Sequence, residues 1–172
     1  MPKDRRTALK VISGAVGGAA ALGVGAPIIR AVMDPSGKTT VSGSGEEVEV
    51  GAYDVLPEDG TPMSVPIVLE RPSDGWNRMP PTQVGSVWLS RHEDGVRALS
   101  TICPHLGCGV DWDVASKRYL CPCHTTWFAP DGTLLEGPSP RGMDPLETKV
   151  VEGRVWVKYE KLLLGIAERV PA

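Results

Sequence analysis

The chain is poor in aromatic residues and in cysteine. Among its 172 residues there are one phenylalanine and four cysteines, against 20 glycines and 16 prolines. Few aromatics with much glycine and proline favour a loop-rich β domain over a helical one. The sequence also has no internal repeat, no phosphate-binding glycine loop and no nucleophile constellation. These absences leave a single globular domain with accessory segments and one chemical centre.

Positive charge is scarce outside the N-terminus. The net charge is −3, and the first ten residues carry four basic side chains and one acidic one, so the remainder carries about −6. No basic patch with interleaved aromatic residues is present. An acidic body of this kind excludes nucleic acid as the expected partner.

The four cysteines and two of the three histidines lie in one stretch, residues 103–124. Cys103 and His105 are separated by one residue, and Cys121 and His124 by two. Two short loops therefore each offer one thiolate and one imidazole. This spacing predicts a metal site with two cysteine and two histidine ligands.

Two chemistries use such a ligand set. A structural zinc ion accepts two cysteines and two histidines, whereas a Rieske 2Fe-2S centre takes two cysteines on one iron and two histidines on the other. A second pair, Cys108 and Cys123, follows the candidate ligands in the two loops. A zinc site has no use for this pair, but a disulfide joining the loops would hold a cluster between them. The pattern favours the cluster and leaves a zinc or disulfide module as an alternative.

Three motifs resemble the two cluster-binding loops and the proline loop of Rieske proteins from cytochrome bc complexes. They read Cys-Pro-His-Leu-Gly-Cys, Cys-Pro-Cys-His-Thr-Thr and Gly-Pro-Ser-Pro, and the resemblance is strongest over residues 101–140. It implies one 2Fe-2S cluster, with Cys103 and Cys121 as ligands of the inner iron and His105 and His124 as ligands of the outer iron. It also implies a disulfide between the remaining two cysteines, Cys108 and Cys123.

The resemblance assigns roles to the tip of the domain. Both ligand histidines are expected to lie there, and His124 is the one predicted to contact quinol, with His105 beside it. A ring nitrogen that does not bind iron can hold or release a proton as the electron moves. Short apolar neighbours, Leu106 and Pro138 among them, are predicted to shield the cluster and leave the imidazole edges open.

Two residues after the last ligand are predicted to tune the cluster potential, because hydrogen bonds to cluster sulfurs stabilise the more negative reduced state. Thr126 aligns with a family serine whose hydroxyl bonds a bridging sulfide. Phe128 replaces a tyrosine that bonds a ligand sulfur in many relatives, and phenylalanine cannot donate. We therefore expect a potential below that of the tyrosine-containing relatives, which suits a menaquinol-type donor. Thr125 stands where glycine is usual.

The N-terminal part predicts a membrane anchor. Residues 11–29 contain no charge, and nineteen residues at about 1.5 Å each are long enough to cross a bilayer. We predict a cytoplasmic N-terminus over residues 1–8, a transmembrane helix over 9–33 and a flexible linker over 34–47. Arg5-Arg6 resembles a twin-arginine export signal, and the same basic residues also satisfy the positive-inside rule. We expect the helix to be retained as an anchor.

The rest of the chain predicts an all-β head over residues 48–160, in the form of an antiparallel Rieske-type β-sandwich with a cluster-binding subdomain at 101–140. Short apolar or alternating runs at 48–50, 64–69, 86–89 and 96–99 indicate strands. Two further runs, 147–151 and 154–158, flank Glu152-Gly153 and predict a closing hairpin. Residues 161–172 are expected to form a short helix or a loose tail.

These observations lead to one hypothesis for function. The chain would be the Rieske iron-sulfur subunit of a bacterial quinol:cytochrome c reductase, with its head on the outer or periplasmic face of the cytoplasmic membrane. It would take one electron from quinol and pass it to a c-type heme, so cytochrome b and cytochrome c subunits are implied partners and activity belongs to the complex. The alternatives are the small Rieske subunit of an arsenite oxidase and a soluble Rieske ferredoxin serving an oxygenase.

Overall fold

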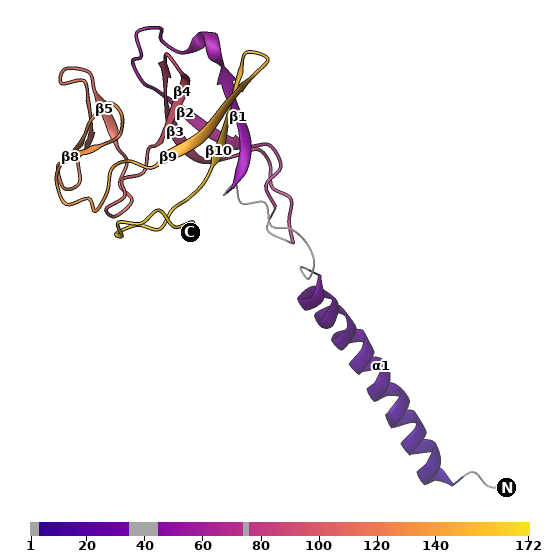
Figure 1. Cartoon of the computed structure of the whole chain (residues 1–172). Helices are drawn as coiled ribbons and strands as arrows, with labels where there is room; N and C mark the ends of the chain where they lie inside the picture. Colours follow the sequence, from indigo (N-terminus) through magenta and orange to yellow (C-terminus); the bar gives the residue numbers. More distant parts are fainter. Residues whose placement is uncertain (1–3, 35–44, 74–75) are drawn as a thin grey trace. The chain divides into compact units, whose positions relative to one another are not determined.

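The computed structural model describes residues 4–34, 45–73 and 76–172. The chain divides into two units, of which one contains the helix α1 and the other contains all the β-strands (Figure 1). Most of the predicted linker, residues 35–44, lies outside the described residues. The predicted linker ends sooner than expected, because the first strand already begins at Glu46.

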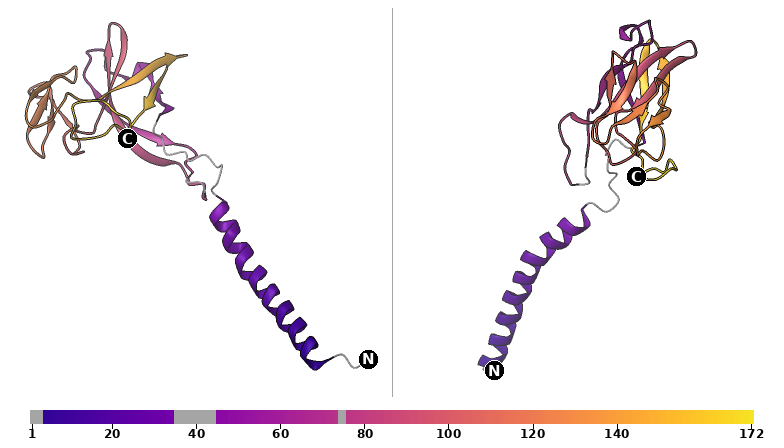
Figure 2. Two further views of the ribbon diagram at one scale, coloured as in Figure 1. Left: turned by 60° about the horizontal axis from the view of Figure 1, so that its bottom comes forward. Right: turned by 90° about the vertical axis from the view of Figure 1, so that its left-hand side faces the viewer.

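α1 spans Arg5–Met33, so it begins four residues before the predicted anchor and ends where predicted. The carboxylate of Asp4 caps the helix by accepting a hydrogen bond from the Arg6 amide at 3.3 Å. The helix continues through Pro27, and both views in Figure 2 show it without a break. Its 29 residues measure about 43 Å. Within the described residues it is the one helix long and apolar enough to cross a membrane.

Six strands form the larger sheet, in the order β1-β10-β9-β4-β3-β2 with antiparallel neighbours. A short 3-10 helix, Tyr53–Val55, follows the first strand. β1 and β2, at the two ends of this order, also lie in contact, so the sheet curls round its core. The strands are β1 Glu46–Ala52, β2 Met63–Leu69, β3 Thr82–His92, β4 Gly95–Ser100, β9 Pro145–Val151 and β10 Arg154–Tyr159.

Alternation of side chains places the core of the head inside this sheet. Along β10, Val155, Val157 and Tyr159 are buried while the residues between them are not. They meet Ile67 and Val87 from the opposite strands in one hydrophobic cluster. All six strands contain the runs predicted from the sequence, and the mostly antiparallel β head is confirmed.

The hairpin between β9 and β10 closes through Glu152 and Gly153, as predicted. Both residues have positive φ angles, 51° and 74°, which a two-residue hairpin turn of this hand requires. Val151 pairs directly with Arg154 across the turn.

Four short strands form a second sheet, in the order β5-β6-β7-β8. They are β5 Asp111–Asp113, β6 Arg118–Cys121, β7 Thr126–Phe128 and β8 Leu134–Glu136. In Figure 1 they form a separate group beside the larger sheet. Tyr119 and Phe128 from these strands pack with Met143, which follows β8 in the chain, in a second hydrophobic cluster. The whole second sheet lies in the chain between β4 and β9, which pair with each other through Leu99 and Pro145.

Residues 161–172 differ from the expectation of a helix or a loose tail. The segment folds back on itself, because the amide of Leu163 donates to the Val170 carbonyl at 2.8 Å and the amide of Ala172 to the Lys161 carbonyl at 2.8 Å. Gly165 has a φ of 74°, which a right-handed helix does not allow. The yellow end of the chain in Figure 1 follows this path.

Candidate metal centre

The first predicted ligand loop is closed by its own backbone. The amide of Cys103 donates to the Cys108 carbonyl at 2.8 Å, and the amide of Gly107 donates to the Cys103 carbonyl at 3.0 Å. Gly107 has a φ of 85°, a conformation that glycine adopts without strain. The tight turn therefore fixes the backbone of His105 at the middle of the loop.

The second predicted ligand loop connects β6 to β7. Cys121 is the last residue of β6 and pairs with Thr126, the first residue of β7, so only four residues lie between them. Thr125 closes this turn with a φ of 53°. A β-branched residue in this conformation is strained by about 1 kcal/mol or more. Glycine would adopt the same conformation without this strain.

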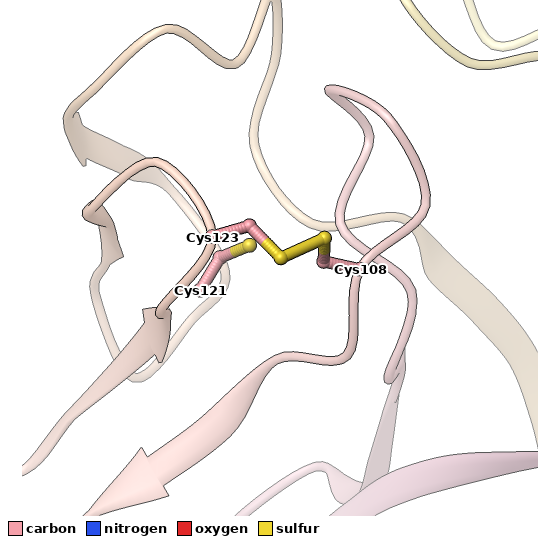
Figure 3. A group of neighbouring side chains, drawn as sticks. All are labelled: Cys108, Cys121 and Cys123. Carbon is pink, nitrogen blue, oxygen red and sulfur yellow. A yellow bond between two sulfur atoms is a disulfide. The ribbon is translucent and has the colours of Figure 1, made fainter.

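A disulfide between Cys108 and Cys123 joins the two loops, with 6.5 Å between the Cα atoms. The disulfide implied by the resemblance is therefore present. In Figure 3 the free sulfur of Cys121 lies beside this bond, and the three sulfur atoms are within 4.8 Å of one another. Because two of these cysteines are bonded to each other, they offer no thiolate to a metal. The donor role falls to the two free cysteines, Cys103 and Cys121.

The fold pairs the predicted ligands, as two buried thiols that neighbour each other and two imidazole rings that are in contact. The side chains of Cys103 and Cys121 are only 1% and 2% exposed. The rings of His105 and His124 lie 4.7 Å apart, centre to centre, at an angle of 78°. His124 is exposed, whereas His105 is half-buried. The site thus has an inner sulfur side and an outer nitrogen side.

Burial raises the pKa of the Cys103 thiol to about 11, and the neighbouring Cys121 adds to this rise. Both effects disfavour a free thiolate in a buried pocket. Without a metal the thiol therefore keeps its proton at neutral pH. Metal binding must displace that proton, which couples loading of the site to pH.

A buried hydroxyl beside the second ligand loop indicates whether a zinc ion or a 2Fe-2S cluster fits this site better. Thr126 is fully buried, and its Oγ1 has no hydrogen-bond partner among the described residues. Buried hydroxyls without partners are rare and costly. A bridging sulfide would accept this hydrogen bond, whereas a lone zinc ion brings no acceptor. Together with the two thiols and two imidazoles, the hydroxyl fits a 2Fe-2S cluster.

The proline loop, residues 137–140, packs directly against Thr126. A Cβ atom on Gly137 would lie 2.6 Å from the Thr126 Cα, and the φ of Gly137 is 111°. Only glycine permits this approach. The Ser139 hydroxyl donates to the Arg141 carbonyl at 2.7 Å, which fixes the exit of the loop.

Two residues next to the proline loop were not predicted from the sequence. Arg141 and Asp144 form a buried ion pair in which two guanidinium nitrogens donate to the two carboxylate oxygens at 2.8 Å each. The sequence pattern that could have predicted this pair is two opposite charges three residues apart, directly after the Gly-Pro-Ser-Pro motif. Neither residue belongs to the cysteine and histidine motifs, so motif reasoning passed over both.

The remaining predicted residues lie around the site. Leu106 is 64% exposed on the first loop, and Pro138 is exposed on the proline loop. Phe128 is fully buried in the same hydrophobic cluster as Cys103 and Cys121. Their assignment to shielding and tuning stays a prediction.

Comparison with known proteins settles the family. The family described as Rieske [2Fe-2S] domain matches residues 49–152. The chain belongs to this family. Its cofactor is therefore one Rieske 2Fe-2S cluster, and the zinc alternative is wrong.

This Rieske protein is similar to known relatives over more of its length than the matched domain. The menaquinol:cytochrome c reductase iron-sulfur subunit of Bacillus subtilis is 31% identical over 162 residues, which cover 92% of this chain and 93% of the relative. The cytochrome b6-f complex iron-sulfur subunit of Chlorobaculum tepidum is 28% identical over 154 residues, which cover 90% and 75%. The chain thus resembles the Rieske subunits of bc-type complexes over nearly its whole length.

Among solved structures, the plasma membrane Rieske protein PetC3 from Synechocystis PCC 6803 is similar. The likeness covers 65% of this chain and 99% of that chain, with 27% identity and a TM-score of 0.46.

Proposed function

We propose that this Rieske protein is the electron-transfer subunit of a respiratory quinol:cytochrome c reductase. The observation that carries the proposal is that the exposed His124, whose ring meets that of His105, lies in the same two loops as the two buried free cysteines. Its near full-length relatives are subunits of oxidoreductase complexes, which supports a redox role. The quinol donor, the cytochrome b and c-type cytochrome partners, and the reaction itself belong to the proposal.

The ligand roles follow from burial. Cys103 and Cys121 would hold the inner iron, and His105 and His124 the outer iron. A bound Rieske cluster supplies a one-electron acceptor whose potential is raised by its imidazole ligands. The second ring nitrogen of His124, the more exposed of the two histidines, would accept a hydrogen bond from a quinol hydroxyl and take its proton. Electron and proton transfer are thereby coupled at one side chain.

The membrane arrangement follows from α1. We propose that the helix is retained as a single-pass anchor in a bacterial cytoplasmic membrane, with the basic N-terminus inside and the head on the outer face. Arg5 and Arg6 begin the helix, which fits both an export signal and the positive-inside rule. Quinol dissolved in the same bilayer would then reach the head from the membrane surface.

The arsenite oxidase alternative gains no support, because the two near full-length relatives are subunits of a quinol:cytochrome c reductase and a b6-f complex. A soluble ferredoxin is also disfavoured, since the chain has both the disulfide and a helix that could span a membrane.

Electron paramagnetic resonance of the reduced membrane fraction tests the proposal, run as a redox titration with and without a quinol-site inhibitor. We expect a Rieske-type signal whose shape or midpoint responds to the inhibitor. His124→Gln should abolish the signal. His92→Gln is the matched control, because this third histidine contacts Ser90 at 3.0 Å, in β3 and outside the two ligand loops. A Rieske signal indifferent to the inhibitor would contradict a quinol-oxidising role.

A further inference from the structure

The C-terminal segment, residues 161–172, is tied to the proline loop by one buried side chain. The guanidinium of Arg141, already paired with Asp144, also donates to the carbonyl of Leu163 at 2.9 Å and to the carbonyl of Ile166. Four of its five N–H donors are therefore used, two on the Asp144 carboxylate and two on the segment. Removing these carbonyls would leave charged donors buried without acceptors, which is costly.

A second arginine ties the segment to the same carboxylate. Arg169 donates from Nε to Asp144 at 3.3 Å and from its terminal nitrogen to the Met143 carbonyl at 3.5 Å. Asp144 therefore receives one guanidinium from the proline-loop side and one from the C-terminal segment. Charge-assisted bonds of this kind are stronger than neutral ones and fix orientation.

The segment also touches the first ligand loop. The amide of Gly165 donates to the Pro104 carbonyl at 2.9 Å. A Cβ atom on Gly107 would lie 3.0 Å from the Leu164 Cδ1, so that methyl group rests on the loop backbone. Gly165 also lies near His105, since a Cβ atom on Gly165 would be 3.7 Å from the His105 carbonyl oxygen. Leu164 and Gly165 thus cover the backbone of the loop that carries a predicted iron ligand.

We propose that residues 161–172 act as a clasp on the first ligand loop, and that Leu164 is a positioning residue for His105. The disulfide at Cys108 holds only one end of this loop. The clasp supports its middle and keeps water from the backbone on that side. This inference rests on the proposed role of His105 as an iron ligand.

Loosening the clasp should change the midpoint potential of the cluster in a predictable direction. Water that approaches the outer iron favours the reduced cluster, because reduction adds a negative charge. The midpoint potential should therefore rise when the clasp is weakened, and the signal of the reduced protein should broaden as the loop samples several positions.

A matched pair of substitutions in the full-length protein tests the clasp. Leu164→Ala removes the contact with Gly107, whereas Val170→Ala changes an apolar residue of the same segment. The two side chains are equally exposed, at 41%. We expect Leu164→Ala to raise the midpoint and broaden the signal, and Val170→Ala to leave both unchanged.

Amide hydrogen exchange on the purified full-length protein gives a readout that does not depend on activity. In Leu164→Ala the amides of residues 103–108 should exchange about fivefold faster, while those of β9 and β10 stay protected. Equal exchange and equal midpoints in the two variants would overturn the clasp. Absence of a Rieske signal from the unsubstituted chain would instead overturn the ligand assignment, and exchange would still report on the clasp.

Discussion

Phe128 lies fully buried in the hydrophobic cluster that contains the two free cysteines. We predict that Phe128→Tyr raises the midpoint potential by about 60 mV, the equivalent of one net hydrogen bond to a ligand sulfur. The change is measured by redox titration of the Rieske signal. Val110→Thr is the control, because it places a hydroxyl in the same cluster at another position. Equal potentials in the two variants would contradict the role assigned to position 128.

At Thr126 the test is to remove a hydroxyl donor instead of adding one. The Thr126 hydroxyl is buried without a partner among the described residues. Thr126→Val keeps the volume and removes the donor, so we expect the midpoint to fall by about 60 mV. The cluster-free chain should lose no stability in thermal unfolding, because no protein hydrogen bond is broken.

Thr101 provides the matched control for this variant. Its hydroxyl contacts the Ser86 hydroxyl at 2.8 Å, so Thr101→Val should cost about 1 kcal/mol of stability and leave the midpoint unchanged. A Thr126→Val protein with the original midpoint would show that the hydroxyl does not reach the cluster.

At the scale of elements, the close approach of the proline loop to β7 depends on Gly137. Gly137→Ala would press a methyl group to 2.6 Å from the Thr126 Cα at a φ of 111°. We expect a loss of about 2 kcal/mol or more and a changed Rieske line shape, because the loop must move away.

Gly153→Ala is the control that separates the backbone strain of a positive φ from the steric clash expected in Gly137→Ala. Gly153 has a φ of 74° but nothing within 4 Å of its would-be Cβ atom. Gly153→Ala should therefore cost about 1 kcal/mol of unfolding free energy and leave the Rieske line shape unchanged. Thermal unfolding and electron paramagnetic resonance of the two variants measure both effects, and equal losses would count against the close packing.

The contribution of the disulfide to the stability of the two ligand loops can also be tested. Its cysteines are 15 residues apart, so the double substitution Cys108→Ser with Cys123→Ser should cost about 3 kcal/mol of unfolding free energy. The Rieske signal should also disappear at a lower temperature, since only the cluster ligands and the intervening chain would then hold the loops together. An unchanged unfolding temperature and an unchanged signal would show that packing alone suffices.

The ligand loops and the strands of the larger sheet could be predicted because their signals are local. Cys103 and His105 belong to one short motif, and the β10 run shows its alternation within six residues. The strands β5, β7 and β8 have three residues each, too few for a period of two to be recognised. Their existence depends on pairing between strands, of β5 and β7 with β6 and of β8 with β7.

The C-terminal segment was missed for a different reason. Its order comes from Arg141 and Asp144, which lie about twenty residues away in the chain. No local pattern in residues 161–172 reports such partners. Likewise, the positive φ of Thr125 depends on how the turn between β6 and β7 closes, which required the structure.

For the whole molecule, α1 predicts how the protein fractionates. The full chain should stay in membranes after an alkaline carbonate wash, because its helix has the length and composition to cross a bilayer. A chain beginning at Gly45 should be released and still show the Rieske signal, since the strands and both ligand loops follow that residue. Release of the full chain, or a mature N-terminus beyond Met33, would contradict a retained anchor.

The place where the second sheet leaves and rejoins the first has a consequence for how the protein is made. Leu99 pairs with Pro145, and the Ser100 amide donates to the Asp144 carbonyl at 2.8 Å, so the ends of the intervening segment are neighbours. The larger sheet can therefore assemble around a looped-out segment that has not yet received iron. The same adjacency makes residues 101–144 a unit that could be transplanted onto another antiparallel pair.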